Sequence, residues 1–319
     1  MALLGRYAPD WIGAAAGGGS WDALTVTGEW WHKGLGFGFR RGFVERVMMS
    51  PAQFGRFAHR LFAAHPIRAV HFATGLQHRT PRGWLRPAIA RPEFRRLTEV
   101  DLSNSWADAG TLAELAGCGN LGRVRCLDLS WTLRLTPAGL RRVASLAFAV
   151  LRSLTARNAR ALGRRDAPDT LAGLVASPRL AGLEALDVWC NALGDEGAGV
   201  LARAAWPLRS LGLGASGITS AGAAVLVRSP RLAGLRELTL AHNRLGDAAV
   251  EAIAASPSLA QVRVFDLSDA GVGDGGAIAL AARPWPLDRL DLARNPGINE
   301  QGIATLRNRY GDRLCVNHE

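Results

Sequence analysis

Apolar residues recur along most of this chain in one pattern, which is clearest over residues 235–259. Leu235, Leu238 and Leu240 place apolar side chains on one side of a short extended segment. Asn243 follows three residues later, and apolar residues then continue at helical spacing. The pattern predicts one strand, one turn and one helix in about 27 residues.

The middle apolar position of the strand can be followed along the chain from residue 94 onwards. It falls at Val100, Leu127, Leu154, Leu186, Leu211, Leu238, Phe265 and Leu290, and Val70 suggests a ninth copy. We therefore expect eight repeats over residues 94–306. Because Leu186, Leu238 and Leu290 are spaced 52 residues apart, two types of repeat alternate.

This LxxLxLxxN pattern followed by a helix resembles the leucine-rich repeat, and the alternation resembles the ribonuclease-inhibitor class of that family. The resemblance implies an α/β fold, a leucine-rich-repeat solenoid with a curved parallel sheet on the concave face and helices on the convex face. Parallel strands stack about 4.8 Å apart whereas helices need about 10 Å, so such a stack must curve. The resemblance also implies protein binding without catalysis.

Four regions follow from the pattern. Residues 1–49 form an irregular segment and connector, and 50–93 form an N-terminal cap with a helix and a degenerate repeat strand. The eight repeats occupy 94–306, and 307–319 form a C-terminal cap. Ser50 and Gln53 predict a capping box at the start of the cap helix, with Pro51 at its first position.

The segment FRRGFVERV, residues 39–47, resembles the connector of bacterial leucine-rich-repeat proteins that carry a repeat-companion domain. Such a domain is not found in this sequence. One hypothesis is therefore a scaffold that belongs to a longer protein.

Small and polar residues at fixed places in each repeat predict structural roles. Asn191, Asn243 and Asn295 are expected to satisfy the backbone of the turn after the strand. Ala159 and Ala270 stand at this position and cannot do so, so the ladder is expected to be weakest there. Ser105, Thr132 and Ser216 replace the amide with a hydroxyl. Five glycines early in the helices, Gly139, Gly197, Gly222, Gly276 and Gly302, are expected to let helix and sheet approach closely. A loop is expected around residues 160–169.

The exposed strand positions line the predicted concave face and are the candidate partner-binding site. They include a column of carboxylates, an acidic strip for a basic partner, and two tryptophans typical of interface anchors. Trp131 and Trp189 are two repeats apart, roughly 10 Å by strand spacing, and could share one contact. The candidate residues are Asp101, Asp128, Trp131, Asn158, Asp187, Trp189, His242, Asp266, Asp269, Asp291 and Arg294.

The net charge of +11 is concentrated near the N-terminus. Residues 1–96 hold 14 basic and 5 acidic residues, against 24 and 22 in the remainder. The alternative function is therefore binding of a nucleic acid or an acidic surface through the basic N-terminal third. Lys33 is the only lysine, which indicates a GC-rich coding sequence and lowers the weight of the arginine count.

Other functional classes find little support in the sequence. No catalytic motif is present, and an open sheet offers no pocket for acid and base catalysis, so we expect no enzyme, cofactor or small-molecule substrate. The four cysteines are far apart, which argues against a zinc site and indicates small buried thiols. No segment has the length and apolarity of a membrane span, and no secretory signal is evident, so cytoplasmic residence is expected.

Overall fold

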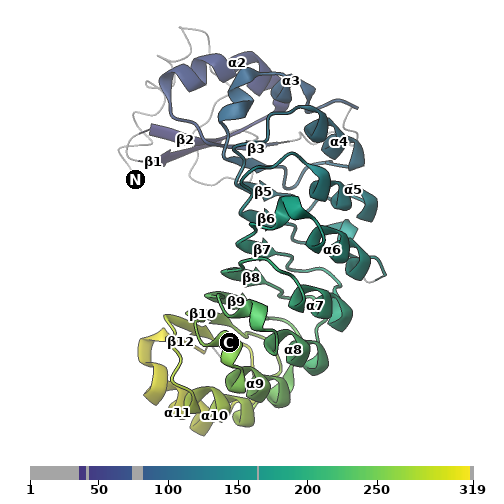
Figure 1. The fold of residues 1–319 in the computed structure, drawn as a ribbon. Helices are drawn as coiled ribbons and strands as arrows, with labels where there is room; N and C mark the ends of the chain where they lie inside the picture. Colours follow the sequence, from purple (N-terminus) through teal and green to yellow (C-terminus); the bar gives the residue numbers. More distant parts are fainter. Residues whose placement is uncertain (1–35, 41–42, 74–81, 164, 317–319) are drawn as a thin grey trace. The chain divides into compact units, whose positions relative to one another are not determined.

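The computed structural model describes residues 36–40, 43–73, 82–163 and 165–316. It divides into two compact units, an N-terminal unit ending at Leu151 and a C-terminal unit beginning at Arg152 (Figure 1). Residues 1–35 of the expected irregular segment and 317–319 of the expected C-terminal cap lie outside the described residues.

The N-terminal unit begins with an antiparallel strand pair and continues as parallel repeats. Its elements are β1 (Gly36–Arg40), β2 (Phe43–Met49), α2 (Pro51–Ala64), β3 (Ala69–Phe72), α3 (Arg86–Ile89), η1 (Pro92–Arg96), β4 (Glu99–Asp101), α4 (Ala109–Gly117), β5 (Cys126–Asp128), α5 (Pro137–Arg141) and η2 (Arg142–Ser145). Because β2 pairs in parallel with β3, and β1 pairs with β2, the sheet continues beyond the strand that was expected to close it.

The C-terminal unit is a regular stack in which each strand pairs in parallel with the next. Its elements are β6 (Ser153–Thr155), η3 (Arg160–Leu162), α6 (Ala167–Val175), η4 (Pro178–Leu180), β7 (Ala185–Asp187), α7 (Gly194–Ala202), β8 (Ser210–Gly212), α8 (Ser220–Val227), η5 (Pro230–Leu232), β9 (Glu237–Thr239), α9 (Gly246–Ala255), η6 (Pro257–Leu259), β10 (Val264–Asp266), α10 (Asp274–Ala282), β11 (Arg289–Asp291), α11 (Glu300–Tyr310), η7 (Gly311–Arg313) and β12 (Leu314–Cys315). Strands and helices alternate, as an α/β leucine-rich-repeat solenoid requires.

The predicted repeat positions are confirmed residue by residue. All eight are the central, buried residue of strands β4 to β11. Equivalent residues pair in register, for example Leu186 with Leu211 and Leu211 with Leu238. Within the expected C-terminal cap, β12 pairs in parallel with β11.

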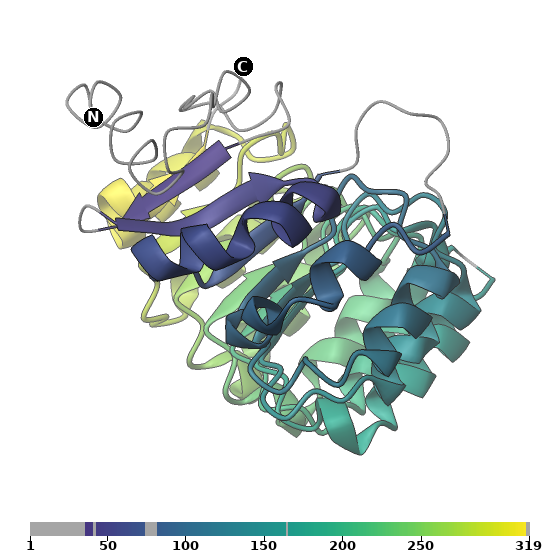
Figure 2. The same ribbon diagram turned by 90° about the horizontal axis from the view of Figure 1, so that it is seen from above.

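The predicted capping box of α2 is also confirmed. The Gln53 amide N–H donates to Ser50 Oγ (3.2 Å), and the Ser50 amide N–H donates to Gln53 Oε1 (2.8 Å). The apolar face of α2 places Phe54 against the rings of Phe62, Phe72 and Phe94, at centroid distances of 5.9, 5.5 and 6.3 Å. Figure 2 shows α2 lying alongside the first strands. A compact aromatic cluster therefore forms the core of this end of the unit.

The asparagines satisfy the turn after their own strand, as predicted, and each one also serves the preceding repeat. Asn243 Oδ1 accepts the amide N–H groups of Ser216 and Ile218 in the preceding repeat, while its Nδ2 donates to the carbonyls of Leu213 and Leu240. Asn191 and Asn295 reach back in the same way. The alternation of repeat types thus corresponds to one asparagine for each pair of repeats.

The expected weak points at Ala159 and Ala270 are therefore wrong. The amide N–H of Ala159 donates to Asn191 Oδ1 (2.9 Å), and that of Ala270 donates to Asn295 Oδ1 (3.0 Å). The following repeat supplies the acceptor that the alanine lacks.

Three smaller expectations need correction. A Cβ at Gly276 would lie 2.9 Å from Asp247 Oδ1 and 3.2 Å from Val250 Cβ, so this glycine allows close approach of neighbouring helices instead of helix and sheet. The expected loop at 160–169 contains the turn η3, and α6 begins at Ala167. The four cysteines are free but only half-buried, because all four lie near strand or helix ends.

Candidate functional site

The five predicted carboxylates lie at the same position of five repeats, and each accepts the same kind of hydrogen bond. One carboxylate oxygen accepts the backbone N–H two residues along the chain, at 2.8 to 3.1 Å. The donor–acceptor pairs are Ser103 to Asp101, Ser130 to Asp128, Trp189 to Asp187, Ser268 to Asp266 and Ala293 to Asp291. These carboxylates therefore fix the turn that ends each strand.

Basic side chains neutralise several of these carboxylates on the same face. Arg157 Nε donates to Asp187 Oδ2 (2.7 Å), and Arg289 Nη2 lies 2.9 Å from Asp291 Oδ2. The side chains of Asp187 and Asp291 are only 24% and 14% exposed, so neither presents a free charge to solvent. The sequence held a signal for these arginines, since strand alternation places residues two apart on one face.

A row of side chains crosses the sheet face of the C-terminal unit. The Trp189 ring lies over Gly214, where an added Cβ would collide with it. Its edge meets the His242 ring at a centroid distance of 6.1 Å and an interplanar angle of 85°. His242 Nδ1 lies 2.8 Å from Asp269 Oδ2. We call Trp189, His242 and Asp269, with Gly214 beneath them, the sheet-face row.

A left-handed backbone position follows each strand and holds most of the other candidates. Trp131, Asn158, His242, Asp269 and Arg294 have φ between 44° and 59°. Trp189 was grouped with them, but the residue at this position of its repeat is Cys190, with φ 57°. Trp189 therefore points from the preceding position, which explains how its ring lies flat over the next strand.

Trp131 is the most exposed aromatic residue among the candidates. In the N-terminal unit it is 45% exposed, and the nearby Leu133 is 53% exposed. Large apolar side chains exposed together are typical of interaction surfaces. Trp131 and Trp189 belong to different units, so their shared contact stays a prediction.

The sheet face of the N-terminal unit carries two pairs of ionisable side chains that the sequence analysis did not identify. Arg46 Nη2 lies 2.7 Å from Glu99 Oε1, and His71 Nδ1 lies 3.6 Å from Asp101 Oδ2. Burial raises the pKa of Glu99, and Arg46 opposes this rise. The first pair joins β2 to β4 across β3, and the second joins the neighbouring strands β3 and β4.

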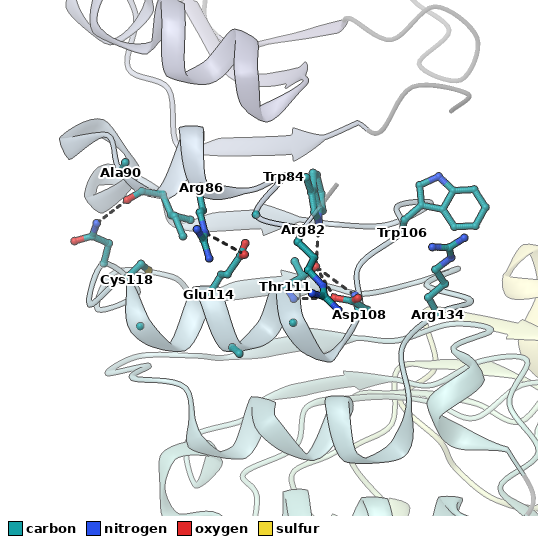
Figure 3. Close-up of a pocket in the computed structure, with 16 residues that line it drawn as sticks. Arg82, Trp84, Arg86, Ala90, Trp106, Asp108, Thr111, Glu114, Cys118 and Arg134 are labelled. Atoms are coloured by element: carbon teal, nitrogen blue, oxygen red, sulfur yellow. Dashed lines mark hydrogen bonds and ion pairs between the residues drawn. The ribbon is translucent and has the colours of Figure 1, made fainter. Parts of the chain in front are cut away.

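The N-terminal unit also contains a pocket of about 910 Å³ between residues 82–90 and α4 (Figure 3). Its polar groups are largely paired with one another. Trp84 Nε1 donates to Thr111 Oγ1 (3.0 Å), and Arg86 Nε lies 3.3 Å from Glu114 Oε1. Arg134 stacks 4.5 Å above the Trp106 ring. Periodicity could not indicate this pocket, because its walls come from separate repeats.

The described part of the chain offers neither a metal centre nor a membrane-spanning helix. No group of three or more His, Cys, Asp or Glu residues there could hold a metal ion. No helix there combines the length and apolarity needed to cross a membrane.

Comparisons with known proteins agree with the repeat architecture. The family model for a leucine-rich repeat matches residues 183–202, 235–254 and 262–281. No curated protein sequence matches the chain. One chain in the crystal structure of the yeast Rad7 and Elc1 complex is 14% identical, with 82% of this chain and 80% of that chain covered and a TM-score of 0.32. The matched segments coincide with the strand and helix units that begin at β7, β9 and β10, so the leucine-rich-repeat model describes these three repeats of the chain.

Proposed function

We propose that this chain is a non-enzymatic protein-interaction module that binds its partner through the exposed face of its parallel sheet. The sheet-face row carries the proposal. It places an aromatic ring, an imidazole and a carboxylate side by side over neighbouring strands of the C-terminal unit. Aromatic anchors surrounded by polar groups are the usual composition of a binding hot spot.

The row is held in place before a partner arrives. Gly214 leaves the space that the Trp189 ring fills, and Asp269 fixes one nitrogen of His242. Side chains that are already ordered lose less conformational entropy on binding. Among the remaining candidates, Arg294 extends the row at the next repeat, and Asn158 lies on the other side of Trp189.

Other features of the proposal follow from the repeats themselves. The alternation of repeat types supports the ribonuclease-inhibitor-like class, and residues 39–47 support a bacterial connector. Cytoplasmic residence accompanies these predictions. In the N-terminal unit, Asp101, Asp128 and Trp131 provide a second exposed surface for the same partner.

Affinity capture with matched variants tests the proposal. The double variant Trp189→Ala, His242→Ala should lose a nuclease-resistant protein partner that the unaltered chain retains. Its control is Val225→Ala, Ile278→Ala, which removes exposed apolar side chains from α8 and α10 in the same unit. Loss of the partner with the control alone would place the binding surface on the helices and exclude the sheet face.

A further inference from the structure

A second cavity of the N-terminal unit is lined by four arginines. It has a volume of about 510 Å³, and Arg68, Arg96, Arg123 and Arg125 line it together with Thr98 and Gly122. We call this the arginine cavity. No carboxylate is among the described residues that line it.

The repeat explains where these side chains come from. Arg68, Thr98 and Arg125 each precede a strand, at the same position of β3, β4 and β5. The backbone at this position joins the repeats: Arg68 O accepts the Thr98 amide N–H (2.8 Å), and Thr98 O accepts that of Arg125 (2.7 Å). At this position only the backbone is needed to join the repeats, so the identity of the side chain can differ from repeat to repeat.

Two carboxylates stand at this position in the C-terminal unit, and each lies beside an arginine of a neighbouring repeat. There Glu184 lies between Arg152 and Arg209, at 3.3 and 3.7 Å, and Asp288 lies 3.5 Å from Arg263. In the N-terminal unit, Thr98 stands between two arginines where Glu184 stands in the other unit. Glu45 holds this position in β2, but it does not line the cavity and is already engaged in an interaction.

The arginines cannot relieve their repulsion by losing a proton, because guanidinium stays charged at all relevant pH values. Arg96 is also fixed in place: its Nη1 donates to the carbonyl of Phe62 (3.2 Å), and its guanidinium lies 4.9 Å from the Phe62 ring. Guanidinium groups that gather around a cavity favour oxyanions, which they bind through paired charge-assisted hydrogen bonds.

We propose that the arginine cavity binds a small anion that carries two or more phosphate groups. Four cationic side chains exceed what one phosphate can neutralise, and a cavity of about 510 Å³ falls within the range of small-ligand sites. The arginine cavity and the sheet-face row share no residue. The anion-binding proposal can therefore be tested independently of the protein-binding proposal.

Calorimetric titration of the full chain with inorganic tripolyphosphate at low ionic strength tests the proposal. We expect saturable binding that Arg125→Gln weakens by about 10-fold or more, since a charge-assisted hydrogen bond is lost. The matched control is Arg263→Gln, which removes one charge from the same repeat position in the C-terminal unit, where Asp288 lies 3.5 Å away. Equal weakening by both variants would indicate attraction by net charge and would overturn the assignment.

Gly122 offers a second test that adds charge without removing an arginine. A Cβ at Gly122 would have no atom within 4 Å, so a side chain there has room beside the arginines. Gly122→Asp should abolish tripolyphosphate binding, whereas Gly122→Ala should leave it unchanged.

Two further results would contradict the proposal. One is the absence of saturable binding up to about 1 mM tripolyphosphate. The other is tighter binding of a short single-stranded oligonucleotide than of tripolyphosphate, with the same dependence on Arg125, which would assign the cavity to nucleic acid.

Discussion

The two units build the same repeat with different polar chemistry. In the C-terminal unit, Asn191, Asn243 and Asn295 each hydrogen-bond two repeats, and two carboxylates at the strand starts, Glu184 and Asp288, lie beside arginines. In the N-terminal unit, Ser105 and Thr132 stand at the asparagine position. A phenylalanine cluster supplies the core there, and arginines gather without carboxylates between them.

The repeat motif therefore determines the backbone geometry of each repeat, whereas the side-chain contacts that stabilise it differ between the two units. Backbone bonds between repeats are the same in both units, while side chains differ in what they bind. At the strand starts of the C-terminal unit, Arg152, Arg209 and Arg263 lie beside carboxylates, whereas no carboxylate is among the described residues that line the arginine cavity. Four predictions follow, from the largest expected effect to the smallest.

The aromatic cluster should dominate the stability of the N-terminal unit. Phe54→Ala removes a ring that contacts three others, so we expect a loss of about 3–5 kcal/mol in the free energy of unfolding. Chemical denaturation would measure the loss of stability, and hydrogen exchange would show which unit is destabilised.

Two controls define this effect. Phe43→Ala, at a site 54% exposed, should change stability by less than about 0.5 kcal/mol. Phe265→Leu in the C-terminal unit should cost under about 1.5 kcal/mol, because leucine occupies the equivalent position of the neighbouring repeats. A larger cost for Phe265→Leu than for Phe54→Ala would contradict the distinction between the units.

The second-largest effect on the free energy of unfolding is expected for the asparagines that hydrogen-bond two repeats. Asn243→Ala leaves the buried amide N–H groups of Ser216 and Ile218 without their acceptor, so we expect a loss of about 3 kcal/mol. Thr132→Val in the N-terminal unit removes one buried hydroxyl bond, to Leu129 O, and should cost about 1 kcal/mol. Denaturation of both variants gives the comparison, and equal losses would show that the asparagine does not bridge two repeats.

The sequence predicted those parts of the fold that depend on periodic burial. Val100 and Leu290 could be placed because each repeat needs one apolar residue at its strand centre. The reach of Asn191 to Ala159 could not be predicted, because it depends on how repeats stack. The left-handed turn after each strand could not be predicted either, because strand alternation ends where this turn begins. The arginine cavity combines residues 68–125, which only the folded unit brings together.

Charge changes at the strand starts should have opposite signs in the two units. Glu184→Gln leaves Arg152 and Arg209 without their carboxylate and should lower stability by up to about 1 kcal/mol. Arg125→Gln relieves repulsion in the arginine cavity and should raise stability by a few tenths of a kcal/mol. Both differences, measured by urea denaturation, should shrink in about 0.5 M NaCl, because salt screens exposed charges. Destabilisation by both variants would argue against uncompensated charge in the cavity.

The smallest expected effect concerns the residue with positive φ that follows each strand. Ala215 in the C-terminal unit has φ 50°, and Asn104 in the N-terminal unit has φ 52°. Asparagine tolerates this conformation better than alanine, because its side chain can hydrogen-bond locally. Ala215→Gly should therefore raise the free energy of unfolding by about 0.5–1 kcal/mol, whereas Asn104→Gly should leave it nearly unchanged. Thermal denaturation of the two variants would measure this difference in stability. A larger increase in stability for Asn104→Gly than for Ala215→Gly would contradict the prediction. It would show that contacts with neighbouring residues, and not backbone strain, determine which residue this turn accepts.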